Sequence, residues 1–326
     1  MSDRKSNISK CLSGPILKDL ADLTSNYDYL FEGKSTHLGK HYPFICCIAE
    51  LPCGKIISGS GATIKIWDPK TFECLKEIVC WDECEDCVGM CVCVISDKYI
   101  ACASRCEYDS LLYIWNLETQ VCESAFTSHT SRINCIIMAD TSKIISGSKD
   151  STIKVWNIET QKCNMTLNND CSINTIAILS DQQIVSGDQN GKIKIWNLLT
   201  EDCILTLDAH NGCVYTIAVF FDGHFISGSI DSTIKVWNKI NNKYNLETTL
   251  TGLGHTDRIT EITILPDDSF IICEDPNILK LWSCESGIYH SVDLQNKEDS
   301  DYIFTFPLSG GRIVSGSSEG SLQIWY

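Results

Sequence analysis

The sequence predicts an all-β chain that closes into a seven-bladed β-propeller of four-stranded antiparallel blades. One motif, IISGSKDSTIKVWN at Ile144–Asn157, recurs in near-copies along almost the whole length. The copies end close to tryptophans spaced roughly 40 to 48 residues apart, a period typical of propellers and repeat arrays. These tryptophans are Trp67, Trp115, Trp156, Trp196, Trp237, Trp282 and Trp325. Most copies also contain two alternating β-branched runs around a short polar turn, which predicts a β-hairpin.

Each repeat supplies four predicted strands. In the repeat around Ile144 the hairpin runs are Lys143–Ser146 and Thr152–Trp156, preceded by Arg132–Met138 and followed by Lys162–Leu167. A sheet of about 40 residues cannot cover both of its own faces, whereas sheets stacked radially cover one another and leave only short edges. Seven repeats therefore predict seven blades.

From about Gly33 to Tyr326 the chain resembles the WD-repeat (WD40) family. In that family a His before the first strand, a Ser in the second, an Asp in the hairpin turn and the Trp of the third form a hydrogen-bonded tetrad. The resemblance implies that such tetrads stabilise individual blades here. Two repeats carry complete sets, namely His129, Ser146, Asp150 and Trp156, and His210, Ser227, Asp231 and Trp237.

The other repeats depart from this pattern. Two of them place a histidine, His41 or His255, at nearly the matching distance before the tryptophan. Three others have Glu85, Asn169 or Glu298 at the histidine position, and we expect their blades to be less rigid.

A His, Ser and Asp within one repeat can also be interpreted as a nucleophilic triad, in which a base activates the hydroxyl and a carboxylate orients the base. The same set recurs with the same spacing in two repeats, which is typical of a structural feature and not of an active site. We therefore assign the tetrads to stability and expect no enzyme activity and no cofactor.

The two ends of the repeat region are complementary. Gly33–His41 matches Cys203–His210, the outer strand and tetrad histidine of a later repeat, so it is an outer strand without a blade before it. The seventh repeat stops at Tyr326, one residue after its tryptophan, and lacks a fourth strand. Family resemblance implies that the N-terminal strand completes the last blade and removes an exposed edge.

We accordingly expect two parts, residues 1–32 as an N-terminal arm and residues 33–326 as the propeller. The arm contains Pro15–Leu23, where a proline is followed by apolar residues at the spacing of a short amphipathic helix. Such a helix is too short to stand alone. It either lies on the propeller wall or docks on a partner.

Charge and cysteine content restrict the partners and the location. The formal net charge is −16, which repels phosphate backbones and anionic membrane surfaces, so nucleic acid and membranes are not expected partners. The N-terminus lacks the apolar core of a secretory signal. We therefore expect a cytoplasmic or nuclear protein, monomeric or part of a larger complex. Its 20 cysteines are then reduced thiols that serve mainly in packing.

One group of cysteines allows a metal site. Cys84 and Cys87 form a CxxC pair in the acidic loop before the second blade, and Cys102 and Cys106 follow near a lengthened hairpin turn. Four thiolates at this spacing could hold zinc. An acidic surface loop in a cysteine-rich chain is favoured, because Cys102 aligns with the buried tetrad serine, so we expect no metal.

In WD-repeat proteins, peptides usually bind where the hairpin turns and the loops leading into the first strands surround the central channel. We call this side the top face. The candidate partner-binding residues there are Phe44, Trp81, Arg132, Lys149, Gln189, Ile230, Arg258 and Asp301. Aromatic and arginine side chains dominate interface hot spots. The mixture therefore fits a protein surface.

The leading functional hypothesis is a non-catalytic scaffold or adaptor that binds a peptide segment of a partner on the top face. An alternative is a substrate receptor of a cullin-type ubiquitin ligase. Such receptors often carry a hairpin-turn Asp and a basic residue three positions after the Trp, and only Lys70 fits the second requirement. A third hypothesis is an enzyme that uses the channel, against which no His, Asp or Glu cluster stands outside the repeat pattern.

Overall fold

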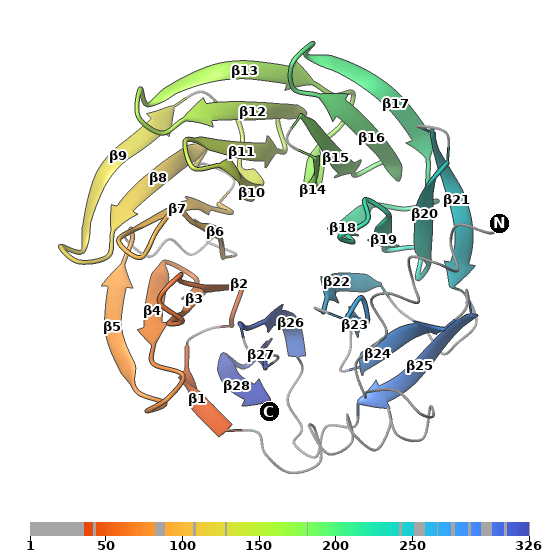
Figure 1. Cartoon of the computed structure of the whole chain (residues 1–326). Coiled ribbons are helices and arrows are strands. Elements are labelled where there is room, and N and C mark those ends of the chain that lie inside the picture. Colours follow the sequence, from red (N-terminus) through yellow and green to blue (C-terminus); the bar gives the residue numbers. More distant parts are fainter. Residues whose placement is uncertain are drawn as a thin grey trace.

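A computed structural model gives the fold. It describes residues 36–41, 44–81, 89–106, 109–127, 129–180, 182–240, 243–250, 258–265, 267–274, 278–285, 288–294, 302–309 and 312–325. These residues form seven four-stranded antiparallel sheets arranged radially in a ring, with the first strand of each sheet nearest the centre (Figure 1). The predicted seven-bladed propeller is confirmed.

The blades follow one another along the chain, each from an inner to an outer strand. Blade 1 is β2 (Cys47–Glu50), β3 (Ile56–Ser60), β4 (Thr63–Trp67) and β5 (Cys74–Val79). Blade 2 is β6 (Met90–Val94), β7 (Tyr99–Ser104), β8 (Leu111–Asn116) and β9 (Val121–Thr127). Blade 3 is β10 (Ile133–Asp140), β11 (Lys143–Ser148), β12 (Thr152–Asn157) and β13 (Lys162–Asn168). Blade 4 is β14 (Ile173–Ser180), β15 (Gln183–Asp188), β16 (Lys192–Asn197) and β17 (Asp202–Asp208).

The remaining blades have the same order. Blade 5 is β18 (Val214–Val219), β19 (Phe225–Ser229), β20 (Ile234–Ile240) and β21 (Lys243–Leu250). Blade 6 is β22 (Ile259–Ile264), β23 (Phe270–Glu274), β24 (Ile278–Glu285) and β25 (Ile288–Leu294). Blade 7 is β26 (Tyr302–Pro307), β27 (Ile313–Ser317) and β28 (Ser321–Trp325), completed by β1 (Thr36–Lys40).

The core lies between neighbouring blades. Strand β11 is buried on both faces from Ile144 onward because a radial sheet packs against one blade on each side. Ile145 and Ile153 of blade 3 pack with Ile173 and Ile176 of blade 4. Gly147 has to be glycine here, since an added Cβ would lie 2.5 Å from Ile173 Cγ2. The recurring Ser-Gly pair of the motif is therefore a consequence of tight packing between blades.

The hairpin turn between the second and third strands ends on a residue in the left-handed region. Ser151 and Ser232 adopt φ values of 67° and 61°, and glycine takes the same place in blades 4 and 7, with 81° at Gly191 and 78° at Gly320. The carbonyl at this position accepts a hydrogen bond from the next loop, as in His41 N to Gly320 O at 2.8 Å. In blades 3, 4 and 7 the hairpin turn thus fixes the loop that leads into the following blade.

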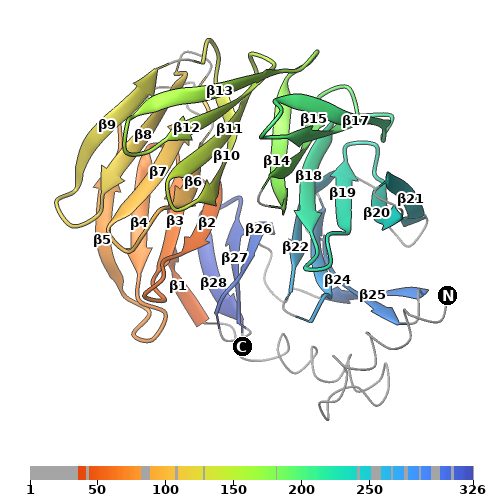
Figure 2. The same ribbon diagram turned by 45° about the horizontal axis from the view of Figure 1, so that its top comes forward.

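The ring closes between the two ends of the chain. Strand β1 pairs antiparallel with β28, with Thr36 opposite Ile324 and Lys40 opposite Ser321, and the two strands lie side by side in Figure 2. Leu38 is buried in a cluster that also holds Leu322. The predicted closure by the N-terminal strand is confirmed, and it joins strands almost the full length of the chain apart.

The predicted N-terminal arm at residues 1–32, with its helix at Pro15–Leu23, lies outside the described residues, so its interpretation stays a prediction. Within the described part, no helix is long and apolar enough to cross a membrane.

Candidate functional site

The first predicted tetrad is assembled around one serine in blade 3. His129 Nε2 lies 2.7 Å from Ser146 Oγ, and Trp156 Nε1 donates to the same oxygen at 2.7 Å. On the other side of the imidazole, His129 Nδ1 lies 2.8 Å from Asp150 Oδ2. The carboxylate also accepts from Thr152 N and from Thr130 N, both at 2.9 Å. The tetrad therefore connects strands β11 and β12, the hairpin turn between them and the loop before the blade.

Blade 5 repeats this network with slightly longer contacts. His210 Nε2 lies 2.8 Å from Ser227 Oγ, and Trp237 Nε1 donates to that oxygen at 2.9 Å. His210 Nδ1 lies 3.2 Å from Asp231 Oδ2. Burial lowers the pKa of His210 to about 4, even though Asp231 opposes that shift. The ring is therefore neutral at physiological pH, and one of its nitrogens donates while the other accepts.

The carboxylates in these networks are stabilised in their charged form. Burial alone would raise the pKa of Asp150, but hydrogen bonds from His129, Thr152 and Thr130 hold that pKa well below its ordinary value. Burial would also raise the pKa of Asp231, but hydrogen bonds from Thr233 and Asn211 outweigh it and lower that pKa. Each Asp therefore acts as a permanent acceptor that orders the hairpin turn.

Other blades keep parts of the network. In blade 1, His41 Nε2 and Trp67 Nε1 both contact Ser58 Oγ at 2.7 Å, and the hairpin turn, one residue shorter than in blade 3, carries no aspartate. Burial, followed by the charge of Lys65, lowers the pKa of His41 to about 3.

Blade 4 replaces the carboxylate. Asn169, at the histidine position, donates through Nδ2 to Asp188 Oδ2 at 3.2 Å, while Trp196 keeps its bond to Ser186 Oγ at 2.9 Å. Asp188 also accepts from Asn190 N at 2.9 Å. Asn190 stands where blades 3 and 5 have the turn aspartate, and the buried Asp188 at the end of the second strand supplies the carboxylate acceptor in its place.

The tetrad geometry does not suit nucleophilic catalysis. Ser146 is fully buried, and its Oγ already contacts both His129 and Trp156. A nucleophile must be within reach of a substrate carbonyl or phosphoryl group, with room for that group beside it. Both features support the structural interpretation of the tetrads.

Backbone hydrogen bonds bring several of the candidate partner-binding residues together at the top face. Lys149 N donates to Arg132 O at 3.0 Å, and Gln189 N and Ile230 N make matching bonds to the loops leading into blades 4 and 5. Lys149, Gln189 and Arg258 are exposed, and the side chain of Ile230 is 47% exposed. The predicted juxtaposition of hairpin turns and preceding loops around the channel is therefore present in these blades.

The predicted aromatic residues are less accessible than expected. Trp81 packs on Tyr113 with ring centroids 5.7 Å apart, and both Trp81 and Phe44 lie against the apolar cluster between blades 1 and 2. Their rings consequently contribute more to that cluster than to an open binding surface. The sequence-predicted residues outside the described part are Cys84, Glu85, Cys87, His255, Glu298 and Asp301.

Two top-face residues were missed by sequence reasoning. Arg105 follows β7 and occupies the same hairpin position as Lys149, with its N–H bonded to Gly89 O at 2.8 Å. The longer hairpin of blade 2 hid this correspondence. Tyr215 falls where the register of β18 shifts between Val214 and Thr216, and its side chain is 40% exposed. A register shift of this kind leaves no clear signal in a single sequence.

Glu261 is the third residue that the sequence did not single out. It lies on β22, the inner strand of blade 6, and burial raises the pKa of its carboxyl to about 7, although the positive charge of Arg105 opposes the shift. The carboxyl of Glu261 in blade 6 and the guanidinium of Arg105 in blade 2 therefore interact electrostatically, although their blades lie on opposite sides of the ring (Figure 1). Such a carboxyl is partly protonated near neutral pH.

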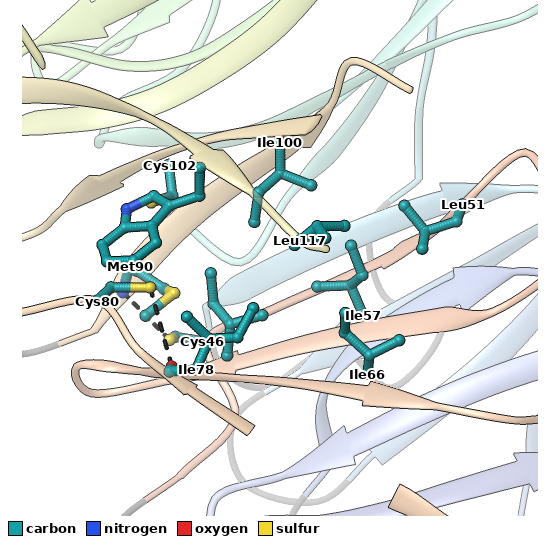
Figure 3. Close-up of a cluster of buried hydrophobic side chains, with 12 residues drawn as sticks. Cys46, Leu51, Ile57, Ile66, Ile78, Cys80, Met90, Ile100, Cys102 and Leu117 are labelled. Carbon is teal, nitrogen blue, oxygen red and sulfur yellow. Dashed lines mark hydrogen bonds between the residues drawn. The ribbon is translucent and has the colours of Figure 1, made fainter. Parts of the chain in front are cut away.

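Two of the four candidate zinc ligands, Cys102 and Cys106, are buried. Cys102 is fully buried on β7, near Cys80 and Cys46 in the cluster between blades 1 and 2, and Cys106 is 5% exposed (Figure 3). Burial raises the pKa of the Cys102 thiol well above its ordinary value, which opposes the thiolate that zinc requires. Among the described residues, no group of three or more His, Cys, Asp or Glu side chains is placed to hold a metal ion. The absence of zinc stays a prediction, since Cys84 and Cys87 are not described.

Comparison with known proteins identifies the repeats. The family model for the WD domain, G-beta repeat, matches residues 33–68, 120–157, 161–197 and 201–238. A search of curated proteins gives no match. Each matched segment begins with the outer strand of one blade and ends with the tryptophan strand of the next, so every sequence repeat joins two blades. With four matched repeats and seven blades of one topology, the chain belongs to the WD-repeat family.

Proposed function

We propose that this propeller is a non-catalytic scaffold or adaptor that binds a peptide segment of another protein on its top face. WD-repeat propellers generally serve as protein-interaction scaffolds, and the fold itself hosts many roles, so the surface has to carry the argument. The supporting observation is the gathering of exposed Lys149, Gln189, Ile230 and Arg258 around one mouth of the channel. None of these side chains is needed to fill the core.

The mixture of side chains suits peptide recognition. Ile230 offers exposed apolar area, and arginine and lysine can bind carboxylates or backbone carbonyls of an extended segment. The hairpin turns that carry Lys149, Gln189 and Ile230 are held by tetrads or an equivalent network, so little ordering of these turns is required when a partner binds.

A reducing compartment is consistent with this role. The cysteines whose side chains are described are free thiols, and many of them are buried in the packing between blades. Thiols of this kind persist in the cytoplasm and nucleus. We therefore propose that the protein binds its partner in the cytoplasm or the nucleus.

The test uses a displayed library of random linear peptides selected on the full-length chain, followed by titration of enriched peptides. Lys149→Ala and Ile230→Ala should weaken binding and leave the melting temperature nearly unchanged. Matched controls on the opposite side are Lys162→Ala and Ile240→Ala, since Lys162 is also exposed and Ile240 is 51% exposed. Equal losses in all four variants, or no loss in any, would place the site elsewhere.

A further inference from the structure

Arg105 is a cation whose hydrogen bonding is incomplete. Its side chain reaches from blade 2 to blade 3, where Nη2 donates to Asn134 O at 3.0 Å. Its Nε is buried and has no hydrogen-bond partner within the described part of the chain. A buried donor without an acceptor is costly, and a charged one more so. The guanidinium therefore has spare donor capacity at the channel mouth.

No carboxylate among the described residues forms an ion pair with Arg105. The acidic group that feels its charge is Glu261, across the channel, whose pKa stays near 7 because burial outweighs the attraction. The tetrad carboxylates of Asp150 and Asp231 are already occupied by their own hairpin turns. Within the described part of the chain, Arg105 is thus a positive charge without a carboxylate in ion-pair contact.

Apolar surface lies on the far side of the same mouth, on blade 5. At the register shifts of blades 3 and 4, the side chains of Asn134 and Asn174 donate to the carbonyls of Ile173 and Val214 in the next blade, at 2.7 and 3.4 Å. Tyr215 holds the same place in blade 5, and its ring is exposed. With Ile230 it forms an exposed pair, 40% and 47% accessible, that we call the Tyr215–Ile230 patch.

We propose that the partner segment lies across the channel mouth, with an acidic side chain against Arg105 and an apolar side chain on the Tyr215–Ile230 patch. This inference rests on the proposed function and names its partner chemistry. A carboxylate can accept from a guanidinium through two oxygens, which supplies the missing acceptor with a charge-assisted bond. Blades 2 and 5 lie on opposite sides of the ring, so an extended segment can contact both (Figure 1).

The global charge favours the opposite partner, a basic segment, because a net charge of −16 attracts cations over a distance. Long-range attraction is screened within about 10 Å at ordinary ionic strength, whereas a buried guanidinium contact is not. The local contact therefore determines which partner side chain lies against Arg105. A preference for a basic partner residue at that position would contradict the proposal.

The experiment selects peptides from the same displayed library on the intact chain and on three variants. Wild type should enrich Asp or Glu at one fixed position with an apolar residue at another. Arg105→Gln should abolish the acidic preference and weaken an enriched acidic peptide about 10- to 100-fold, as expected for loss of a charged hydrogen bond. Arg312→Gln is the matched control, since Arg312 lies before β27 near the opposite mouth, with Nη1 donating to Pro69 O at 3.5 Å. It should change neither property.

A third variant tests the direction of the electrostatic effect. Glu261→Gln removes the carboxylate that competes for the charge of Arg105, so it should strengthen binding of the acidic peptide. The same peptide with Asn in place of its acidic residue should lose this gain. Weaker binding in Glu261→Gln would contradict the assignment.

Folding is controlled by Arg105→Lys, which keeps the charge while shortening its reach, and by thermal unfolding of each variant. Enriched peptides that depend on Ile230 but show no acidic preference, or the same preference in Arg105→Gln, would overturn this inference and leave the proposed function standing. Peptides insensitive to Lys149, Ile230 and Tyr215 alike would overturn the proposed function itself.

Discussion

The Asp150→Ala substitution gives a sharp test of the tetrad. The carboxylate accepts from His129 Nδ1 at 2.8 Å, from Thr130 N at 2.9 Å, and from Thr152 N and Oγ1 at 2.9 and 2.6 Å. Alanine removes all four contacts from a side chain that is only 6% exposed. Thr152 Oγ1 lies 3.2 Å from His129 Nδ1 and offers a partial replacement, and water can reach the exposed Thr130 N–H.

The expected loss is therefore about 1–3 kcal/mol, the cost of leaving one or two buried polar groups unsatisfied. Denaturant unfolding followed by tryptophan fluorescence measures it, because Trp156 belongs to the same network. Asp208→Ala, which removes an exposed aspartate from an outer strand, should change stability by less than about 0.5 kcal/mol. Indistinguishable midpoints for Asp150→Ala and the parent would refute the stabilising role of the tetrad.

Three further outcomes follow from the same structure. Because burial holds the pKa of His41 near 3, below its unfolded value of 6.5, the unfolded chain binds more protons and stability falls as pH drops from about 6.5 toward 3. His41→Asn should reduce this dependence, with His210 keeping its own contribution, and an unchanged pH profile would contradict the assignment. Removing residues 1–40 deletes β1 and exposes the edge of β28, so the truncated chain should aggregate or unfold at a much lower denaturant concentration. A peptide spanning Tyr27–His41 should partly rescue it. A monomeric truncated chain with the unfolding midpoint of the parent would exclude this closure. Purified protein should contain no stoichiometric zinc, whereas elemental analysis showing about one zinc per chain, lost on replacing Cys84 and Cys87, would establish the metal site.

The architecture could be predicted because the repeat is local and strongly patterned. Alternating β-branched runs, Ser-Gly pairs and a terminal tryptophan mark three strands in five of the seven blades, and the match of Gly33–His41 to a later outer strand predicted the closure that β1 and β28 form. These features depend on packing between adjacent blades, which sequence spacing specifies directly.

The binding face could be predicted only in part, because its residues depend on irregular geometry. Lys149 and Ile230 occupy turns that a repeat alignment places at the channel. Arg105 follows a hairpin of unusual length, and Tyr215 is presented by a register shift, so neither position stands out in the sequence. Trp81 was expected at the surface and instead packs on Tyr113, since the partner ring comes from the next blade.

Hydrogen exchange of the full-length chain, with and without a peptide enriched on it, tests the claim of a top-face binding site most directly. Backbone amides at the hairpin turns 148–151, 188–191 and 229–232 should exchange more slowly when the peptide is bound. The turns at the opposite side, 157–161, 197–201 and 220–223, should exchange at the same rate in both states. Protection confined to that opposite side, or to the outer strands, would contradict the proposed peptide-binding function of the top face.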